Sequence, residues 1–355
     1  MFSKSKSGLL ASVLLVCCIL SFVASACSPS KKMQPTAKPK LEVLGFYEKG
    51  WNDLTYGYPS LEKYYKDINI LVPYWYTVQK DGSLGISKIG FEQKVADFVN
   101  KHPQVKLIPL VNNEKDSLAM LSDQDIRTTA INNIVKKVTE NNYAGVNIDF
   151  ELLPKEYKGH LNSFIAELAK KLKAQNKLLL ISVFPKVNVS EDVSGAYDYK
   201  TLGRQADLIT IMTYDNHSDS SGPGSVAPYG WVEENIKFAA KSIPKNKIAV
   251  CIGAYGYDWP VPTSAGDIEY IGLKEALDRA QEKGAKIQWD DDSQSPFFTY
   301  TADNGTEHKV WFENGYSAAK KIALAKELGI HGIAIWRMGF EDAEYWNQVR
   351  KELQK

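Results

Sequence analysis

The 355-residue chain carries 43 Lys and Arg against 42 Asp and Glu, a formal net charge of +1, and 44% of its residues are hydrophobic. Nothing in this balance suggests nucleic-acid binding, so we expect no nucleic-acid partner. Four cysteines, two of them inside an N-terminal apolar stretch, exclude a disulfide framework.

The N-terminus has the pattern of an export signal. Two lysines precede the apolar stretch Leu9–Val23, and the small residues Ala24-Ser25-Ala26 stand directly before Cys27. Small residues before a cysteine resemble the lipobox of bacterial lipoproteins, in which the cysteine is acylated. We therefore expect a signal peptide over 1–26, a lipid anchor at Cys27 and a flexible tether over 27–40, with a plain secretory signal as the alternative. The protein would be exported and held at the cell membrane, facing the cell wall. Cys251, the one cysteine outside this N-terminal region, is expected to be a core residue with a free thiol.

Eight strand-like apolar runs follow the tether, and most are separated by segments of helical periodicity. The runs are Leu41–Tyr47, Ile68–Tyr76, Val105–Val111, Gly145–Leu152, Leu178–Phe184, Leu208–Tyr214, Lys247–Tyr255 and Gly332–Arg337. The clearest helical segments are Asp123–Glu140, Tyr157–Gln175 and Trp231–Ser242. Strands that alternate with helices predict parallel βαβ units, and eight such strands predict a closed (β/α)8 TIM barrel over 41–355, which is an α/β fold. We expect the protein to be a monomer. An open doubly wound sheet is the alternative, although no glycine-rich phosphate loop follows the first run.

The distance between the seventh and eighth runs is too long for one crossover. The intervening segment, about 256–311, contains a helical stretch at Leu273–Lys283 and strand-like pieces at Lys286–Trp289 and Phe297–Thr301. We interpret it as a small α+β insertion on the rim of the barrel. Helices at Tyr316–Leu328 and Tyr345–Leu353 then complete the fold.

The fourth run is the most informative, because it alternates apolar and polar residues with a period of two. As a strand it places Val146, Ile148 and Phe150 on one face and Asn147, Asp149 and Glu151 on the other. Carboxylates that point inward together are costly unless the interior is a polar site. A solvated edge strand is the alternative. The pattern favours an internal site in which Asp149 and Glu151 flank one small group.

Two further strand ends carry residues suited to the same site. The sixth run ends in Met212-Thr213-Tyr214-Asp215, and the eighth ends in Trp336. Because reacting groups of a (β/α)8 barrel lie at the C-terminal ends of its strands, these residues are expected to converge with Asp149 and Glu151.

At these residues the chain resembles glycoside hydrolase family 18, the chitinase-like family. Gly145, Asp149 and Glu151 match its fourth-strand signature Asp-Gly-x-Asp-x-Asp-x-Glu in register, whereas Ala144 replaces its first aspartate and Asn147 its middle aspartate. The insertion is similar to that of the branch containing spore-cortex and peptidoglycan hydrolases. The resemblance covers the chain from Leu41 onward.

The resemblance implies a division of roles. Glu151 would be the proton donor, and the substrate's own 2-acetamido group would attack the anomeric carbon in a substrate-assisted, retaining mechanism. Asp149 would orient that group, Tyr214 and Asp215 would hold it, and Trp336 would stack under the sugar. We also expect the charge of Asp149 to raise the pKa of Glu151, and the Asn147 amide to leave Asp149 more ionised than an aspartate would.

Other strand-end residues are candidates for binding sugar, with core packing or turn capping as the alternative. These candidates are Asn147, Met212, Tyr47, Trp75, Tyr76 and Asn112, with Trp231 and Trp259 in outer positions. His217 and His308 have no partners at ligand spacing, so we expect no metal and no cofactor.

The sequence thus predicts a glycosidase that cleaves β-1,4 bonds next to N-acetylglucosamine in peptidoglycan, spore cortex or a chitin-like polymer. The alternatives are a non-catalytic glycan-binding or germination lipoprotein on the same barrel, and an endo-enzyme that trims other glycans. Retention of Glu151 favours the enzyme.

Overall fold

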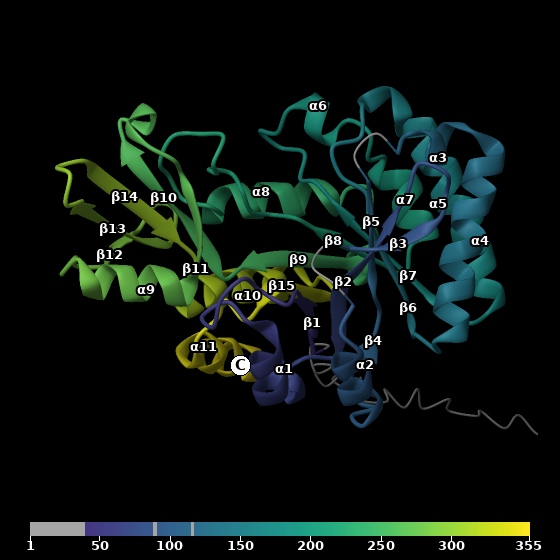
Figure 1. Ribbon diagram of the computed structural model, residues 1–355, viewed down its shortest axis with the longest axis horizontal. Helices are drawn as coiled ribbons and strands as arrows, with labels where there is room; N and C mark the ends of the chain where they lie inside the picture. The colour runs from purple at the N-terminus through teal and green to yellow at the C-terminus, as the bar shows by residue number, and fades with distance from the viewer. Residues whose placement is uncertain (1–39, 88–90, 115–116) are drawn as a thin grey trace, which may run out of the picture. The chain divides into compact units, whose positions relative to one another are not determined.

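Eight parallel strands close into a barrel in the computed structural model of the chain, which describes residues 40–87, 91–114 and 117–355 (Figure 1). In order around the barrel they are β1 (Glu42–Tyr47), β2 (Ile70–Val78), β5 (Leu110–Asn113), β6 (Gly145–Asp149), β7 (Leu178–Val183), β8 (Leu208–Ile211), β9 (Ile248–Gly253) and β15 (Gly332–Met338). Parallel pairing of β1 with both β2 and β15 closes the ring. Two short strands, β3 (Leu84–Ile86) and β4 (Lys106–Leu107), also pair with β2. The predicted TIM barrel is confirmed, and the open sheet is excluded.

Alternation along the strands creates two cores. Side chains that point inward fill the barrel: Leu44, Phe46, Ile70, Val72, Ile108, Leu110, Leu180, Leu208, Met212, Ala249, Cys251 and Ala334. Side chains of the opposite parity, such as Val146 and Ile148, pack outward against the helices. Cys251 is buried with a free thiol in the inner core, as predicted.

Helices surround the strands, and the longest carry the periodicity seen in the sequence. In α5 (Lys158–Ala174) the buried residues are Leu161, Phe164, Ile165, Leu168 and Leu172. The Asp123 side chain caps α4 (Gln124–Glu140) by accepting hydrogen bonds from the backbone N–H groups of Asp125 and Ile126. The remaining helices are α1 (Gly57–Tyr64), α2 (Gln93–Asn100), α3 (Ala119–Ser122), α6 (Glu191–Ser194), α7 (Tyr199–Gln205), α8 (Tyr229–Ala239), α9 (Leu273–Glu282), α10 (Gly315–Leu328) and α11 (Ala343–Gln354).

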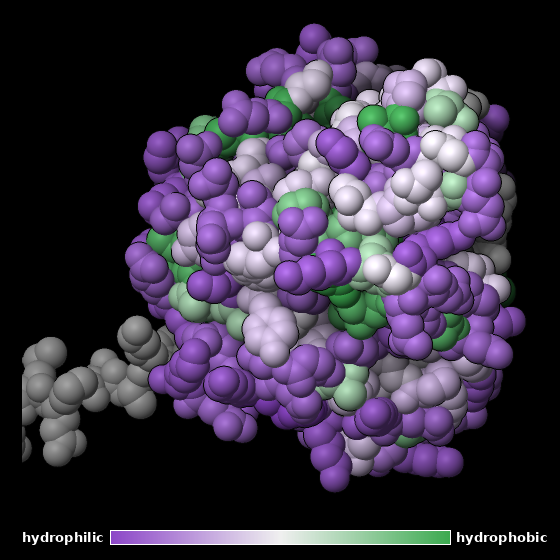
Figure 2. All heavy atoms as spheres, turned by 90° about the vertical axis from the view of Figure 1, so that its left-hand side faces the viewer, coloured by the Kyte–Doolittle hydropathy of each residue, from purple (hydrophilic) through white to green (hydrophobic). Residues whose placement is uncertain are grey.

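The segment predicted as an insertion lies between β9 and β15 and forms its own antiparallel sheet. Its strands are β10 (Tyr255–Val261), β11 (Glu269–Gly272), β12 (Gln288–Asp290), β13 (Ser295–Thr301) and β14 (Glu307–Phe312), in the order β11-β10-β14-β13-β12. Figure 1 shows this sheet and α9 on the left of the barrel, with α4 on the right. The face seen in Figure 2 is mostly hydrophilic, with small separate hydrophobic areas.

The fourth barrel strand is shorter than predicted, since β6 ends at Asp149 rather than at Leu152. Glu151 therefore stands two residues beyond the end of the strand. Leu152, which has a left-handed backbone (φ 52°) and is 70% exposed, then turns the chain outward. At the start of the strand, a Cβ on Gly145 would lie 2.2 Å from the carbonyl oxygen of Leu178. This close approach of β6 to β7 explains the glycine of the motif.

The predicted signal peptide over 1–26, Cys27 and nearly all of the predicted tether lie outside the described residues. Within the described part of the chain, no helix is both long and apolar enough to cross a membrane.

Candidate active site

A cavity of about 300 Å³ opens at the C-terminal ends of the barrel strands. It is lined by Phe46, Glu48, Asp149, Glu151, Ser182, Phe184, Met212, Tyr214, Asp215, Tyr255, Tyr270 and Trp336. The structure therefore brings the predicted residues of the fourth, sixth and eighth strands to one place. The inward parity of β6, β8 and β15 produces this convergence.

Asp149 lies deep in this cavity and is 6% exposed. Burial, and then the charge of Glu151, raise its pKa well above the ordinary value, while a hydrogen bond from Ser182 opposes the rise. Its Oδ1 atom has no hydrogen-bond partner among the described residues. A buried carboxyl in this state holds a proton readily.

Glu151 lies above Asp149, and its position is fixed through its backbone. The Asn113 side chain accepts from the Glu151 N–H (2.7 Å) and donates to the Glu151 carbonyl oxygen (3.2 Å). Burial, followed by the charge of Asp215, raises the pKa of Glu151 from 4.5 to about 7, whereas the hydrogen bond with Asp149 acts to lower it. The carboxyl can thus be protonated near neutral pH, as a general acid requires.

Two electrostatic expectations are corrected by this geometry. Asp215, rather than Asp149, is the charge that raises the pKa of Glu151, because Asp149 is itself driven toward its neutral form. The Asn147 amide does not keep Asp149 ionised, since it donates to the Ser182 hydroxyl (2.9 Å). Thr210 donates to the same hydroxyl (3.0 Å), so Asn147 acts one residue away from the carboxylate and does not line the cavity.

Asp215 forms the side wall and is held by two tyrosines of the insertion. Its Oδ1 accepts from the hydroxyls of Tyr255 (2.6 Å) and Tyr257 (2.9 Å). Asp215 is in contact with solvent on the cavity side. The protein around its carboxylate still removes enough water to raise its pKa, whereas the hydrogen bonds from the two tyrosine hydroxyls act to lower it. Tyr214, the residue before Asp215, packs edge-to-face on Tyr255 with ring centroids 5.8 Å apart.

Trp336 provides an aromatic surface in the cavity. Its ring lies 5.5 Å from that of Phe46, and its Nε1 donates to the Tyr270 hydroxyl (3.2 Å). Tyr270 belongs to β11, so the insertion also fixes the orientation of this indole. A braced aromatic face beside two carboxyls suits a ligand with both an apolar face and polar groups.

Four predicted binding residues lie elsewhere. Tyr47, Trp75 and Tyr76 point outward into the core between strands and helices. Phe46 and Tyr74 occupy the inward positions next to Tyr47 and Trp75, and a register irregularity between Tyr74 and Tyr76 turns Tyr76 outward as well. Tyr47 donates to Glu92 (2.5 Å), and the Tyr76 hydroxyl is 2.9 Å from that of Tyr143. Asn112 is inside the barrel but donates to the Tyr74 hydroxyl (2.7 Å) and does not line the cavity.

Glu48 is a cavity residue that the sequence reasoning missed. It follows β1, and its carboxylate oxygen Oε2 lies 3.1 Å from Nε of the fully buried Arg337. Burial raises the pKa of Glu48, and Arg337 opposes that rise. Continuing the alternation of β1 by two residues from Phe46 would have predicted that this side chain points inward.

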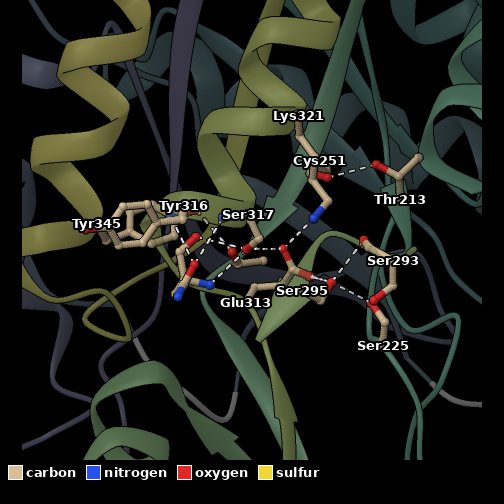
Figure 3. A network of polar contacts seen from close by, with 12 residues as sticks. Thr213, Ser225, Cys251, Ser293, Ser295, Glu313, Tyr316, Ser317, Lys321 and Tyr345 are labelled. Atoms are coloured by element: carbon tan, nitrogen blue, oxygen red, sulfur yellow. Dashed lines mark hydrogen bonds and ion pairs between the residues drawn. The ribbon is translucent and has the colours of Figure 1, made fainter. Parts of the chain in front are cut away.

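A buried ion pair secures the wall formed by the insertion (Figure 3). Lys321 on α10 donates to Glu313 (2.5 Å), and the two side chains are 1% and 0% exposed. Glu313 also accepts from Ser317 (2.8 Å) and Ser295 (3.3 Å), and its N–H donates to the carbonyl of Tyr255 (2.9 Å). The pair therefore joins the barrel to the strand that carries the tyrosine partner of Asp215.

A second cavity, of about 190 Å³, adjoins the first and shares Phe184, Met212, Tyr214 and Asp215 with it. Trp231 lines it, with its Nε1 donating to the Val187 carbonyl (2.8 Å), whereas Trp259 is fully buried in the insertion. Over residues 40–87, 91–114 and 117–355, no group of three or more His, Cys, Asp or Glu side chains could hold a metal ion.

Comparisons with known proteins agree with this geometry. The family model described as glycosyl hydrolases family 18 matches residues 42–341. The chain is 28% identical to the glycosylase YvbX of Bacillus subtilis (strain 168) over 310 residues, 84% of this chain and 88% of YvbX. It is 30% identical to the cortical fragment-lytic enzyme of the same organism over 231 residues, 64% of this chain and 54% of that enzyme, so it spans about half of that relative.

Two solved structures are similar over most of the chain. A chitinase from Chromobacterium violaceum ATCC 12472 has a TM-score of 0.82 and 27% identity, covering 89% of this chain and 99% of the chitinase. The spore cortex-lytic enzyme SleL of Bacillus megaterium QM B1551 has a TM-score of 0.80 and 28% identity, covering 90% of this chain and 75% of SleL. The chain belongs to glycosyl hydrolase family 18, and it is a glycosidase of the kind represented by chitinases and cortex-lytic enzymes.

Proposed function

We propose that the chain is a retaining β-N-acetylglucosaminidase that cleaves the β-1,4 bond on the reducing side of an N-acetylglucosamine unit. The observation that carries this proposal is the pair Glu151 and Asp149 in one cavity, with the pKa of Glu151 raised to about 7. A protonatable carboxyl at this depth is what protonation of a glycosidic oxygen requires.

The cavity suits a substrate-assisted mechanism. The sugar stacks on Trp336, and Glu151 gives its proton to the leaving oxygen as the C1–O bond breaks. The acetamido oxygen of the same sugar forms a bond to C1, while the Asp149 carboxylate in the cavity lining accepts a hydrogen bond from the acetamido N–H. The Tyr214 hydroxyl, also in the cavity lining, donates a hydrogen bond to the acetamido group. Water then opens the cyclic intermediate at C1, with Glu151 as the base, and the configuration at C1 is retained.

We further propose peptidoglycan or spore cortex as the polymer. The cortical fragment-lytic enzyme and SleL support this choice by their names, and the adjoining cavity leaves room for part of a second sugar unit beyond the cleaved bond. We also propose that the protein is exported, lipid-anchored at Cys27 and monomeric. Residues 1–26 would be its signal peptide, 27–40 its tether and 41–355 the catalytic barrel.

The test is to incubate the purified chain with peptidoglycan, cortex fragments and chitin oligomers, and to identify new reducing ends by mass spectrometry. New N-acetylglucosamine reducing ends are expected, and the polymer that yields them names the substrate. Binding of these glycans without cleavage at any pH would instead support the non-catalytic glycan-binding lipoprotein. New ends on a different sugar would contradict the proposed specificity.

The rate is expected to fall with rising pH above about 7. Because the raised pKa of Glu151 keeps the acid protonated below that pH, kcat/KM should decrease tenfold per unit above it. Asp215→Asn removes a charge that raises this pKa, so the midpoint of the fall should move to lower pH. A pH–rate profile of both proteins is the measurement, and an unmoved midpoint would contradict the assigned cause.

The same shift predicts a loss of stability as pH rises. Folded Glu151 binds a proton more tightly than it does in the unfolded chain, so its contribution to the free energy of unfolding is largest below pH 4.5 and is lost by about pH 7. Glu151→Gln should flatten this part of a curve of unfolding free energy against pH. Asp149, shifted in the same direction, adds to the slope that remains.

Glu48 is expected to bind the glycan. Its carboxylate lies in the cavity wall, and a charge-assisted hydrogen bond to a sugar hydroxyl contributes about 1.5–3 kcal/mol. Glu48→Ala should therefore weaken oligosaccharide affinity by about tenfold or more in calorimetry. Glu48→Gln, which keeps an acceptor oxygen, should lose less. Equal affinity in both variants and the parent would contradict this role.

A further inference from the structure

Eight cationic side chains gather at the end of the barrel opposite the catalytic cavity. They lie at the C-terminal ends of α5 and α7 and on the connections that follow α5, α7 and α8 and lead into β7, β8 and β9, which are neighbours in the sheet. This basic patch consists of Lys170, Lys171, Lys173, Lys177, Arg204, Lys241, Lys245 and Lys247. Five of them, Lys170, Lys173, Lys177, Arg204 and Lys247, line one surface cavity of about 470 Å³.

The basic patch is not neutralised by neighbouring acids. Among the described residues, none of its eight members lies within ion-pair distance of a carboxylate. The segments that carry the patch, 170–177, 204–207 and 241–247, contain a single acidic residue, Asp207, whose carboxylate accepts the Leu179 N–H (2.8 Å). In a chain with a net charge of +1, such a concentration of one sign is a local asymmetry.

Helix dipoles and backbone capping account for part of the patch only. Lys171, Lys173 and Arg204 stand in last helical turns, where cations are favoured. Lys247 donates to the carbonyls of Gly203 (3.2 Å) and Ala206 (2.7 Å). Neither reason applies to Lys241, which is exposed beyond the end of α8, and Lys245 is exposed at the start of the single 3-10 turn Lys245–Lys247.

The chain enters the barrel at the same end. All eight strands are parallel, so the starts of β7, β8 and β9 lie at the end where β1 starts. Lys40, where the proposed tether joins the barrel, is two residues before β1. A surface that approaches this end meets both Lys40 and the basic patch, and it leaves the catalytic cavity unobstructed at the other end.

We propose that the basic patch docks on an anionic phospholipid membrane, so that the base of the barrel rests on the bilayer and the active site faces away from it. Clustered Lys and Arg side chains attract anionic headgroups, and the attraction fades beyond a Debye length of about 10 Å at 0.1 M salt. A tether alone fixes distance but not orientation. The basic patch supplies orientation.

The test uses residues 28–355, the proposed exported chain without its apolar signal segment and without the cysteine that would carry lipid. Co-sedimentation is measured with vesicles of phosphatidylcholine alone and with vesicles containing a third phosphatidylglycerol, at 0.05 M and 0.5 M NaCl. Binding that depends on phosphatidylglycerol and is lost at high salt is expected. The variant Lys170→Glu, Lys241→Glu, Lys245→Glu should lose at least tenfold of that binding.

The matched control reverses the same amount of charge elsewhere, through Lys80→Glu, Lys286→Glu and Lys309→Glu, all exposed. It should bind within about twofold of the parent, and thermal unfolding should show that both variants fold. Equal losses in the two variants, or binding indifferent to phosphatidylglycerol, would overturn the proposal. So would a patch-dependent interaction with soluble polyanionic wall polymer that vesicles do not reproduce. Since vesicle binding needs no catalysis, the result is independent of the proposed activity.

Discussion

Glu151→Gln is expected to reduce kcat by about 10²–10⁴-fold, the usual contribution of a general acid, while glycan affinity stays within about twofold. Glutamine keeps the size of the side chain and the backbone hydrogen bonds to Asn113, but it cannot give a proton to the leaving oxygen. Turnover of chitin or peptidoglycan oligomers and calorimetric affinity for the same oligomers are the two measurements.

The matched control is Glu156→Gln, which makes the same chemical change on an exposed residue of the same connection, outside the cavity. It should leave both quantities unchanged. Near-full turnover in Glu151→Gln would refute the acid assignment. Loss of affinity together with turnover would indicate a structural role for Glu151 instead.

The sequence could predict the acid because alternation in one strand is a local property. The order Asn147, Asp149, Glu151 against Val146, Ile148, Phe150 defines two faces without any knowledge of neighbouring strands. The barrel then brings Tyr214 and Trp336 to the same face, since the carboxyl ends of parallel strands meet at one end. Both steps need periodicity and topology only.

The remaining features depend on long-range contacts. Adjacent aromatic residues at a strand end, such as Trp75 and Tyr76, give no parity of their own, and a register irregularity between Tyr74 and Tyr76 keeps both outward. Tyr255 and Tyr257 reach Asp215 from the insertion, 40 and 42 residues away in the chain. The cause of the pKa shift of Glu151 could not be predicted, because the burial of Asp149 decides which carboxyl remains charged.

The insertion is part of the catalytic apparatus, not an addition to its rim. It supplies both hydroxyls that hold Asp215 and the Tyr270 hydroxyl that holds Trp336. Asp215 in turn raises the pKa of the acid. A change that loosens the insertion should therefore alter the chemistry at Glu151 without touching it.

The Glu313–Lys321 pair offers this change and carries the second large effect. Glu313→Gln leaves the Lys321 ammonium buried without its carboxylate, so the free energy of unfolding should fall by about 3–5 kcal/mol in urea titrations. Lys321→Met should cost a similar amount by leaving the carboxylate uncompensated. The double variant leaves no buried charge and retains Ser317 and Ser295 as partners of the amide, so it should recover most of the loss.

The exposed pair Glu233–Lys237 is the control, since Lys237→Met removes an i,i+4 contact worth about 0.3–0.5 kcal/mol. Additive losses in the Glu313–Lys321 double-mutant cycle would show that the pair does not act as a unit.

If the pair also positions Tyr255 through the Glu313 N–H, the folded double variant should retain glycan affinity but show a shifted basic limb in its pH–rate profile. A purely structural pair would leave that limb near pH 7, so the profile separates anchoring of the fold from control of the acid.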